Sequence, residues 1–191
     1  MTNKQLSIIY RINVRDEIVF VNGLWDRVAL ANNSSNLIYR EIVGRPIWEF
    51  ITGYVSQDLY KQLVKKVRSG KPVRFNFRCD TPETRRQMEM CITLRKNEQV
   101  QFESKIILAE KRPFQRLFCI DTPRSEDIIN ACGWCKKINV EKDVWLESEE
   151  AISVMGIFEN NKLPNISHGI CGDCHGPWLK EIDEQKKKNC V

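Results

Sequence analysis

The chain has 191 residues, of which 42% are hydrophobic and 29% are charged, as in a globular protein with a buried core. No apolar run approaches the roughly 18 residues needed to cross a bilayer, and the first residues lack the apolar segment of a secretory signal, so we expect a cytoplasmic protein that does not enter the membrane. In a reducing compartment, its eight cysteines indicate metal binding or redox chemistry rather than disulfide bonds.

The net charge of +5 is divided unevenly along the chain. Residues 1–125 carry 22 Lys and Arg against 13 Asp and Glu, a balance of +9, whereas residues 126–191 carry 8 against 12, a balance of −4. No predicted helix concentrates basic residues in one stripe. We therefore interpret the charge as a solvated surface of mixed sign, and we do not expect binding to nucleic acid.

The pattern of residues 6–111 predicts an α+β domain. Strands are predicted near residues 8–14, 18–21, 73–80, 88–95 and 100–108. Helices are predicted between the second and third strands, with Asn22 as the N-cap of the first helix and Ser56 as the N-cap of the longest one. The later strands have one apolar and one polar face, so the helices should cover only one side of an antiparallel sheet.

Several motifs in this region resemble those of PAS domains. Residues 19–22 (VFVN) followed by Trp25 are similar to the second strand and first helix of that family, and residues 43–45 (VGR) followed by Trp48 are similar to its central turn. The stretch 75–90 is similar to a bacterial subgroup of PAS-like proteins that also carries a C-terminal cysteine box. The resemblance implies a five-stranded antiparallel sheet with helices on one face and a sensory pocket between the two layers.

The resemblance also implies which residues line that pocket. The candidates are Tyr10, Trp48, Phe50, Phe75, Phe77, Met88 and Met90. Ordinary core packing is the alternative role of each, and it is the commoner role of large apolar residues at strand spacing. The pocket is expected to hold a small apolar ligand or none.

Neither haem nor flavin is expected in the pocket. Residues 1–130 contain no histidine that could ligate haem. Cys79 and Cys91 lie on predicted strands and do not match the reactive-cysteine motif of the flavin-binding members. Cys79 is expected on the apolar face as an inert small hydrophobe.

Two CxxC pairs are the strongest chemical signal in the chain. Cys132, Cys135, Cys171 and Cys174 can place four thiolates around one ion, which predicts a structural Zn²⁺ site. The 35 residues between the pairs are expected to hold a helix, and this tail, with few apolar groups, is expected to gain most of its order from the metal. His168 is expected to support the site through a hydrogen bond, with direct ligation as the alternative.

The cysteine segment, with the motifs CGWCKK and SHGICGDC, resembles a box found at the ends of bacterial signalling proteins. Two other uses of these cysteines remain open. The pairs could form a reversible dithiol switch or the centre of a thiol oxidoreductase. The sequence from Cys171 to His175 also matches the CxxCH haem-attachment motif, whose use is not expected because that chemistry requires export.

The predicted organisation is a PAS-like sensor domain at 1–111, a linker at 112–130, a four-cysteine zinc segment at 131–178 and a charged tail at 179–191. The sequence lacks a Ser-His-Asp arrangement and a phosphate-binding glycine loop, so no enzyme is expected. We expect a signal-transduction protein whose partners are other signalling proteins or a second copy of itself. A thiol-based redox sensor or oxidoreductase and a nucleic-acid-binding regulator are the alternatives.

Overall fold

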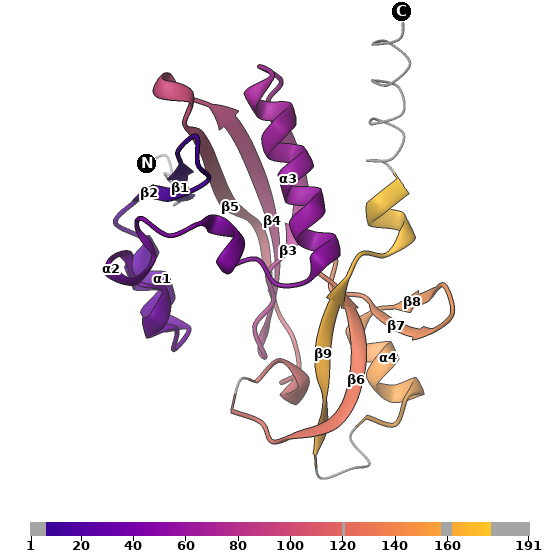
Figure 1. Ribbon diagram of the computed structural model, residues 1–191. Helices are drawn as coiled ribbons and strands as arrows, with labels where there is room; N and C mark the ends of the chain where they lie inside the picture. Colours follow the sequence, from indigo (N-terminus) through magenta and orange to yellow (C-terminus); the bar gives the residue numbers. More distant parts are fainter. Residues whose placement is uncertain (1–6, 120, 158–161, 177–191) are drawn as a thin grey trace, which may run out of the picture. The chain divides into compact units, whose positions relative to one another are not determined.

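The computed structural model describes residues 7–119, 121–157 and 162–176, and the chain forms two compact units. The first unit comprises Met1–Cys79 and Thr84–Lys111, and the second comprises Asp80–Glu83 and Arg112–Val191. Figure 1 shows their elements coloured along the chain. Among the helices in the described ranges, none has both the length and the apolar character needed to span a membrane.

The first unit is an α+β domain built on one antiparallel sheet. Its strands are β1 (Ser7–Ile12), β2 (Ile18–Val21), β3 (Val73–Arg78), β4 (Thr84–Leu94) and β5 (Val100–Lys111). Its helices are α1 (Trp25–Ala31), η1 (Ser35–Leu37), α2 (Tyr39–Ile42), η2 (Ile47–Glu49), α3 (Tyr54–Arg68) and η3 (Lys96–Glu98), where η marks a 3-10 helix. The strand order is β2-β1-β5-β4-β3, so the predicted five-stranded antiparallel sheet is confirmed.

One face of the sheet forms the hydrophobic core. Val73, Ile92 and Phe102 lie in one row across β3, β4 and β5, and each is at most 3% exposed. Helix α3 packs on these three strands and buries the apolar stripe Leu59, Leu63, Val64 and Val67. This spacing places the four side chains on one side of the helix, so its polar residues remain outside the core.

The opposite face of the sheet is polar. Glu89 on β4 accepts hydrogen bonds from Lys105 on β5 and Arg74 on β3, at 2.9 and 2.8 Å. The Lys105 ammonium, followed by the Arg74 guanidinium, holds the pKa of the Glu89 carboxyl below its usual value. The expectation that helices cover only one side of the sheet agrees with this polar face.

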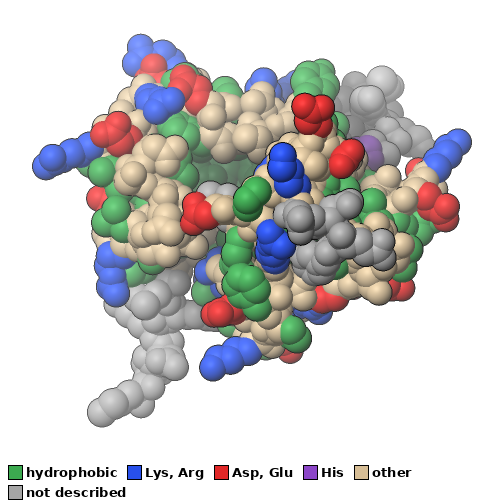
Figure 2. All heavy atoms as spheres, turned by 90° about the horizontal axis from the view of Figure 1, so that it is seen from below, with side chains coloured by type: hydrophobic (Ala, Val, Ile, Leu, Met, Phe, Trp, Pro, Cys, Tyr) green, Lys and Arg blue, Asp and Glu red, His purple; other side chains and the backbone are tan. Residues whose placement is uncertain are grey.

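Charged residues of both signs are interspersed on the molecular surface. On the face shown in Figure 2, Lys and Arg side chains are scattered among Asp and Glu side chains and do not gather into one patch. This view agrees with the interpretation of the net charge as a mixed, solvated surface.

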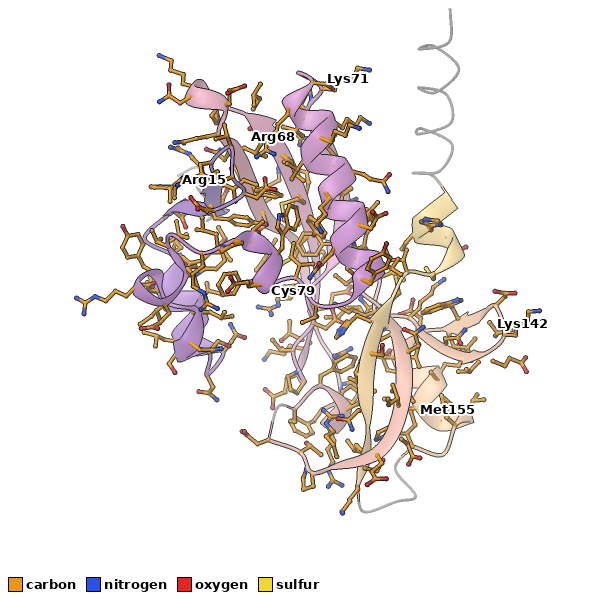
Figure 3. All side chains as sticks on the ribbon, in the orientation of Figure 1. Arg15, Arg68, Lys71, Cys79, Lys142 and Met155 are labelled. Carbon is orange, nitrogen blue, oxygen red and sulfur yellow. The ribbon has the colours of Figure 1, made fainter. Side chains whose placement is uncertain are left out.

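Three local predictions for the first unit are wrong. Helix α1 begins at Trp25, and the Asn22 side chain instead donates to the carbonyl of Ser7 at 2.7 Å. Ser56 lies buried inside α3, which begins at Tyr54, so it is not an N-cap. Cys79 is exposed just after β3 (Figure 3), because the strand ends before the alternation reaches it.

Within the described residues, the second unit contains a mixed sheet, a short α-helix and a further helical segment at residues 172–176. Its elements are η4 (Arg116–Phe118), β6 (Arg124–Cys132), β7 (Ile138–Glu141), β8 (Val144–Leu146), α4 (Ser148–Val154) and β9 (Leu163–Gly169). The strand order is β8-β7-β6-β9, with β6 and β9 parallel and the other pairs antiparallel.

The predicted linker at 112–130 is corrected by the structure, since η4 and most of β6 belong to the second unit. Leu117 and Ile129 are at most 6% exposed in its core, while the adjacent Ile128 is 70% exposed. The prolines at positions 113 and 123 are typical of a linker. The short alternation of apolar and polar residues that marks β6 begins only after them.

The single helix expected between the CxxC pairs is also corrected. The intervening chain forms the β7–β8 hairpin, the short helix α4 and strand β9. Together with η4 and β6, these elements bury a hydrophobic cluster made of Leu117, Ile129, Ala131, Ile138, Ala151, Ile152, Ile157 and Leu163. The second unit therefore has more apolar contacts than its sequence indicates, because its buried apolar residues come from five separate elements and the turn after α4.

A buried arginine explains why Asp80–Glu83 belongs to the second unit. The guanidinium of Arg112, with its side chain 5% exposed, pairs with Asp80 at 3.2 Å and with Glu149 of α4 at 3.1 Å. It also donates to the carbonyl of Thr81 at 2.8 Å and lies 4.7 Å from the centre of the Phe118 ring. One side chain thus joins the 80–83 turn, η4 and α4 within this unit.

Candidate metal centre

The four predicted cysteine ligands come together at one edge of the second unit. The Sγ atoms of Cys132, Cys135, Cys171 and Cys174 all lie within 4.8 Å of one another. The sulfurs of Cys135 and Cys171 are 3.6 Å apart. A tetrahedral Zn²⁺ site with ordinary Zn–S bonds has sulfurs about 3.8 Å apart, so the cluster has the dimensions of a metal site.

The parallel pairing of β6 and β9 brings the two CxxC turns together. Cys132 is the last residue of β6 and is aligned with Gly169, the last residue of β9, and Cys171 follows two residues later. Since parallel strands end at the same edge of a sheet, both turns begin at that edge. Strand pairing thus brings together two CxxC pairs that are separated by 35 residues in the sequence.

Backbone hydrogen bonds define each turn and join the two. In the first turn, the Lys136 N–H donates to the carbonyl of Cys132 at 3.0 Å, and in the second the Cys174 N–H donates to the carbonyl of Cys171 at 3.1 Å. Between the turns, the Gly133 N–H donates to the carbonyl of Gly169 at 2.9 Å. The Cys171 N–H points to the Cys132 sulfur at 3.5 Å, as donors do around metal-bound thiolates.

Burial of the four sulfurs is uneven. Cys132 and Cys171 are 0% and 1% exposed, whereas Cys135 and Cys174 are half-buried. The first position of each pair therefore lies against the protein core and the second faces outward. A metal ion held here would be enclosed by the protein on one side and accessible to chelators from the other.

The electrostatics of the cluster favour a bound cation. Hydrogen bonds from Cys135 and Cys174 lower the pKa of the Cys132 thiol far below its usual value. The same bonds raise the pKa of Cys135 to about 12 and that of Cys174 well above its usual value. One thiolate is thus stabilised by its protonated neighbours, and four together require a positive charge to offset their repulsion.

Two lysines of the first turn stand beside the cluster. The Lys136 ammonium donates to the carbonyl of Gly133 at 3.0 Å. Lys137 pairs with Asp173 of the second turn at 2.9 Å, which joins the two turns through side chains. His168 is half-buried on β9, opposite Ala131, and the four-cysteine cluster does not include it. Its role as a supporting hydrogen-bond donor stays a prediction.

The seven candidate pocket residues fall into two groups. Phe75 and Phe77 on β3 are paired with Met90 and Met88 on β4, and the two phenylalanine rings are 6.2 Å apart. Tyr10 on β1 stacks on Phe102 of β5 with the ring centres 4.5 Å apart. These five candidates therefore lie on the inner face of the sheet.

Trp48 and Phe50 lie in and after η2 and contact charged groups. The Trp48 indole N–H donates to the Asp16 carboxylate at 2.9 Å, and the Lys61 ammonium lies 5.4 Å from the centre of the Trp48 ring. Phe50 lies under the guanidinium of Arg45 at 4.8 Å. Asp16 also pairs with Arg68 of α3. Figure 3 labels Arg68 and also Arg15, the neighbour of Asp16 in the turn after β1. Asp16 therefore joins this turn to η2 and α3 within the first unit.

Sequence reasoning missed the parallel strand pairing and three aromatic residues of the first unit. Trp25 and Phe102 flank Tyr10, and the Tyr60 ring on α3 lies 6.4 Å from that of Phe75. Tyr60 could have been found, because it falls on the core side of the amphipathic pattern of α3. The partner of β6 could not, because no local signal specifies a parallel partner across 30 residues.

No protein-family model matches the chain, and no curated protein matches it. Among solved structures, it is similar to the RpfR quorum-sensing receptor PAS domain of Cronobacter turicensis in complex with C12:0, at 12% identity over 56% of this chain and 100% of that one, with a TM-score of 0.40. It is also similar to a domain of an HTR-like protein from Haloarcula marismortui ATCC 43049, at 16% identity over 53% and 98%, with a TM-score of 0.34. These likenesses are distant, and the fold is defined here by strand order and burial.

Proposed function

We propose that this chain is a non-catalytic cytoplasmic signalling protein with a sensory or adaptor role. In this proposal, the second unit holds a structural Zn²⁺ ion and the first unit binds a small apolar ligand or a protein partner. The partner is another signalling protein or a second copy of the chain. The observation that carries the proposal is the gathering of four cysteine sulfurs within 4.8 Å from two distant turns.

Zinc is the ion that best fits this donor set. Four thiolates in a tetrahedral arrangement suit Zn²⁺ or iron, and a closed four-cysteine site leaves no open position for a substrate. A closed site of this kind stabilises structure, which agrees with a unit whose buried cluster is built mainly from leucine, isoleucine and alanine side chains.

The sensory role of the first unit is supported by its sequence and its layers. The VFVN and VGR motifs resemble those of PAS domains, and helices lie on the apolar side of a five-stranded antiparallel sheet. Phe75, Met88 and Met90 are 6–8% exposed between these layers, where a ligand would contact them. A small molecule held there is the expected signal.

Native mass spectrometry of freshly purified protein tests the proposal. The expected mass shift corresponds to one zinc ion per chain, which is lost on incubation with a chelator and is missing from Cys132→Ser. A retained small molecule or a dimer would appear in the same spectrum. Iron in place of zinc, or a metal-free protein whose second unit remains folded, would contradict the structural-zinc proposal.

A thiol-based redox role is the second candidate, because the sulfurs of Cys135 and Cys171 are already 3.6 Å apart. Alkylation with iodoacetamide separates the two roles. Metal-bound cysteines react only after a chelator is added, whereas a redox-active pair reacts at once and is protected by an oxidant. Nucleic-acid binding is not favoured, since the second unit has 11 Lys and Arg against 15 Asp and Glu.

A further inference from the structure

The two sheets formed by the described residues have four edge strands, β2, β3, β8 and β9. An edge strand presents backbone N–H and C=O groups that can pair with another chain. Charged side chains, proline, short length or a covering loop usually prevent such pairing. These protections are distributed unevenly among the four edges, and β9 has the fewest of them.

Each of the other three edges is protected. A loop covers β2, since the Ile18 N–H donates to the carbonyl of Arg45 at 2.9 Å and the Ile18 carbonyl accepts from the Gly44 N–H at 2.8 Å. Strand β3 carries two arginines in six residues, and β8 has only three residues. Strand β9 has seven residues, and none of them is Asp, Glu, Lys or Arg.

Hydrogen bonds between β6 and β9 show which backbone groups of β9 point away from the sheet. The Gly133 N–H donates to the carbonyl of Gly169 at 2.9 Å, so residue 169 directs its backbone groups toward β6. The pairing with β6 is regular over residues 165–169. Since consecutive residues of a strand direct these groups to opposite sides, the N–H and C=O groups of Ile166 and His168 point to the open edge.

The open edge of β9 is blocked at its beginning and free farther along. Pro164 also faces this edge, but it has no N–H, and its carbonyl accepts from the Arg124 guanidinium at 2.9 Å. Within the described part of the chain, β9 pairs only with β6, and no turn or loop bonds to the backbone of Ile166 or His168. These two residues therefore offer two N–H and two C=O groups to water or to another strand.

We infer that two copies of this chain associate by antiparallel pairing of their β9 edges, with Ser167 on the two-fold axis. In this register, Ile166 of each copy lies opposite His168 of the other, and the two residues exchange N–H···O=C bonds. Every free N–H of one copy then meets a free C=O of the other. A register centred on Ile166 would instead place His168 opposite Pro164, which has no N–H to donate.

The side chains of β9 fit this two-fold contact. Ser167 is exposed on the face of β9 opposite to the hydrophobic cluster, and in the dimer it lies opposite its own copy, where two hydroxyls can bond each other. Asn165 lies opposite Gly169 of the second copy, which has no side chain to obstruct it. On the other face, Ile166 packs at the margin of the cluster and is only partly buried, so pairing would bury it further.

This self-complementarity favours a second copy over an unrelated extended peptide, because one short segment supplies both halves of the contact. The inference goes beyond the proposed function, which assigns partner binding to the first unit. It gives the second unit a contact surface of its own, independent of any ligand in the first unit.

Analytical ultracentrifugation of the full-length protein over a range of concentrations tests the inference. The wild type is expected to form dimers with a micromolar Kd, since a short strand contact buries little area. Ser167→Lys places two ammonium groups opposite each other on the axis, and the Kd should rise at least about 10-fold. Ser167→Glu should have the same effect when it is studied alone.

Mixing the two variants distinguishes charge repulsion from a disturbed fold. An equal mixture of Ser167→Lys and Ser167→Glu places opposite charges across the axis, so dimers should form again with at least the wild-type affinity. Ile128→Lys is the matched control, because Ile128 is 70% exposed beside Asn165 on the same face of the neighbouring strand β6, away from the edge. Its Kd should equal that of the wild type.

The outcomes separate this inference from the proposed function. Monomers at every concentration overturn the inference and leave the zinc and ligand proposals in place. Dimers that resist both Ser167 variants, or that only Ile128→Lys dissociates, place the contact elsewhere and also overturn it. Failure of the mixture to restore dimers contradicts the two-fold register. Zinc content, measured by native mass spectrometry, decides the proposed function separately from all of these results.

Discussion

The two units of this protein differ in what holds them together. The first buries aromatic and aliphatic residues between a five-stranded sheet and α3, with Phe102 fully enclosed. The second buries an aliphatic cluster and places four cysteines at the joined ends of β6 and β9. A small domain buries a smaller fraction of its surface, so metal ligation is an efficient supplement to its core. The comparison indicates that metal removal should affect one unit and leave the other intact.

Cys171→Ser is expected to have the largest effect on this comparison. It removes one of four thiolates, and structural zinc contributes about 10–16 kcal/mol in small zinc-dependent domains. We expect loss of stoichiometric zinc and rapid hydrogen exchange along β6 and β9, with β4 and β5 still protected. Cys79→Ser is the control, since Cys79 is an exposed thiol of the first unit. Unchanged exchange in β6 and β9 would show that the apolar cluster alone suffices.

Core truncations test whether the units unfold independently. Phe102→Ala should lower the free energy of unfolding of the first unit by about 3–5 kcal/mol, and Leu163→Ala that of the second by about 2–5 kcal/mol. Both side chains are at most 1% exposed, so each truncation leaves a cavity. Urea unfolding followed by segment-resolved hydrogen exchange should show only the mutated unit shifted. A common shift of both units in each variant would show one cooperative fold.

Tyr60→Phe sharpens the comparison at alkaline pH. Because the folded pKa of about 12 exceeds the unfolded value, the native state holds the phenol proton more tightly, and stability is lost as pH rises from about 10 through 12. At alkaline pH, the free energy of unfolding of the first unit should fall by up to about 2 kcal/mol less in the variant than in the wild type. Near neutral pH, the two proteins should be equally stable. Tyrosinate absorbance and urea midpoints across this range measure the effect. An identical alkaline loss in both proteins would contradict the burial of this hydroxyl.

Gly169→Ala is expected to have the smallest effect, and it tests how closely the two cysteine turns are joined. A Cβ at this position would lie 2.9 Å from the Asn130 side-chain oxygen. Asn130 is exposed and can turn away, so we expect a loss of only about 1 kcal/mol in the stability of the second unit.

Adding Asn130→Ala to Gly169→Ala should restore the lost stability, because the two changes share one contact. Thermal unfolding of the zinc-loaded single and double variants measures the coupling. A double variant as unstable as Gly169→Ala would show that the backbone at residue 169, rather than the Asn130 side chain, limits the site.

The sequence by itself determined the features that depend on local pattern. Alternation over residues 73–80, 88–95 and 100–108 predicted three strands of the sheet, because side chains of a strand point to opposite faces in turn. The CxxC spacing identified all four cysteines of the cluster, since two residues between ligands allow one turn to present both sulfurs.

Only the tertiary structure decided the features that join distant segments. The parallel pairing of β6 with β9 places Cys132 beside Gly169, and the burial of Leu117 and Ile129 turns an expected linker into part of a core. The contact between the Tyr60 ring and Phe75 likewise depends on how α3 lies across the sheet. These features arise from packing between elements, and local propensity does not specify which element will be the neighbour.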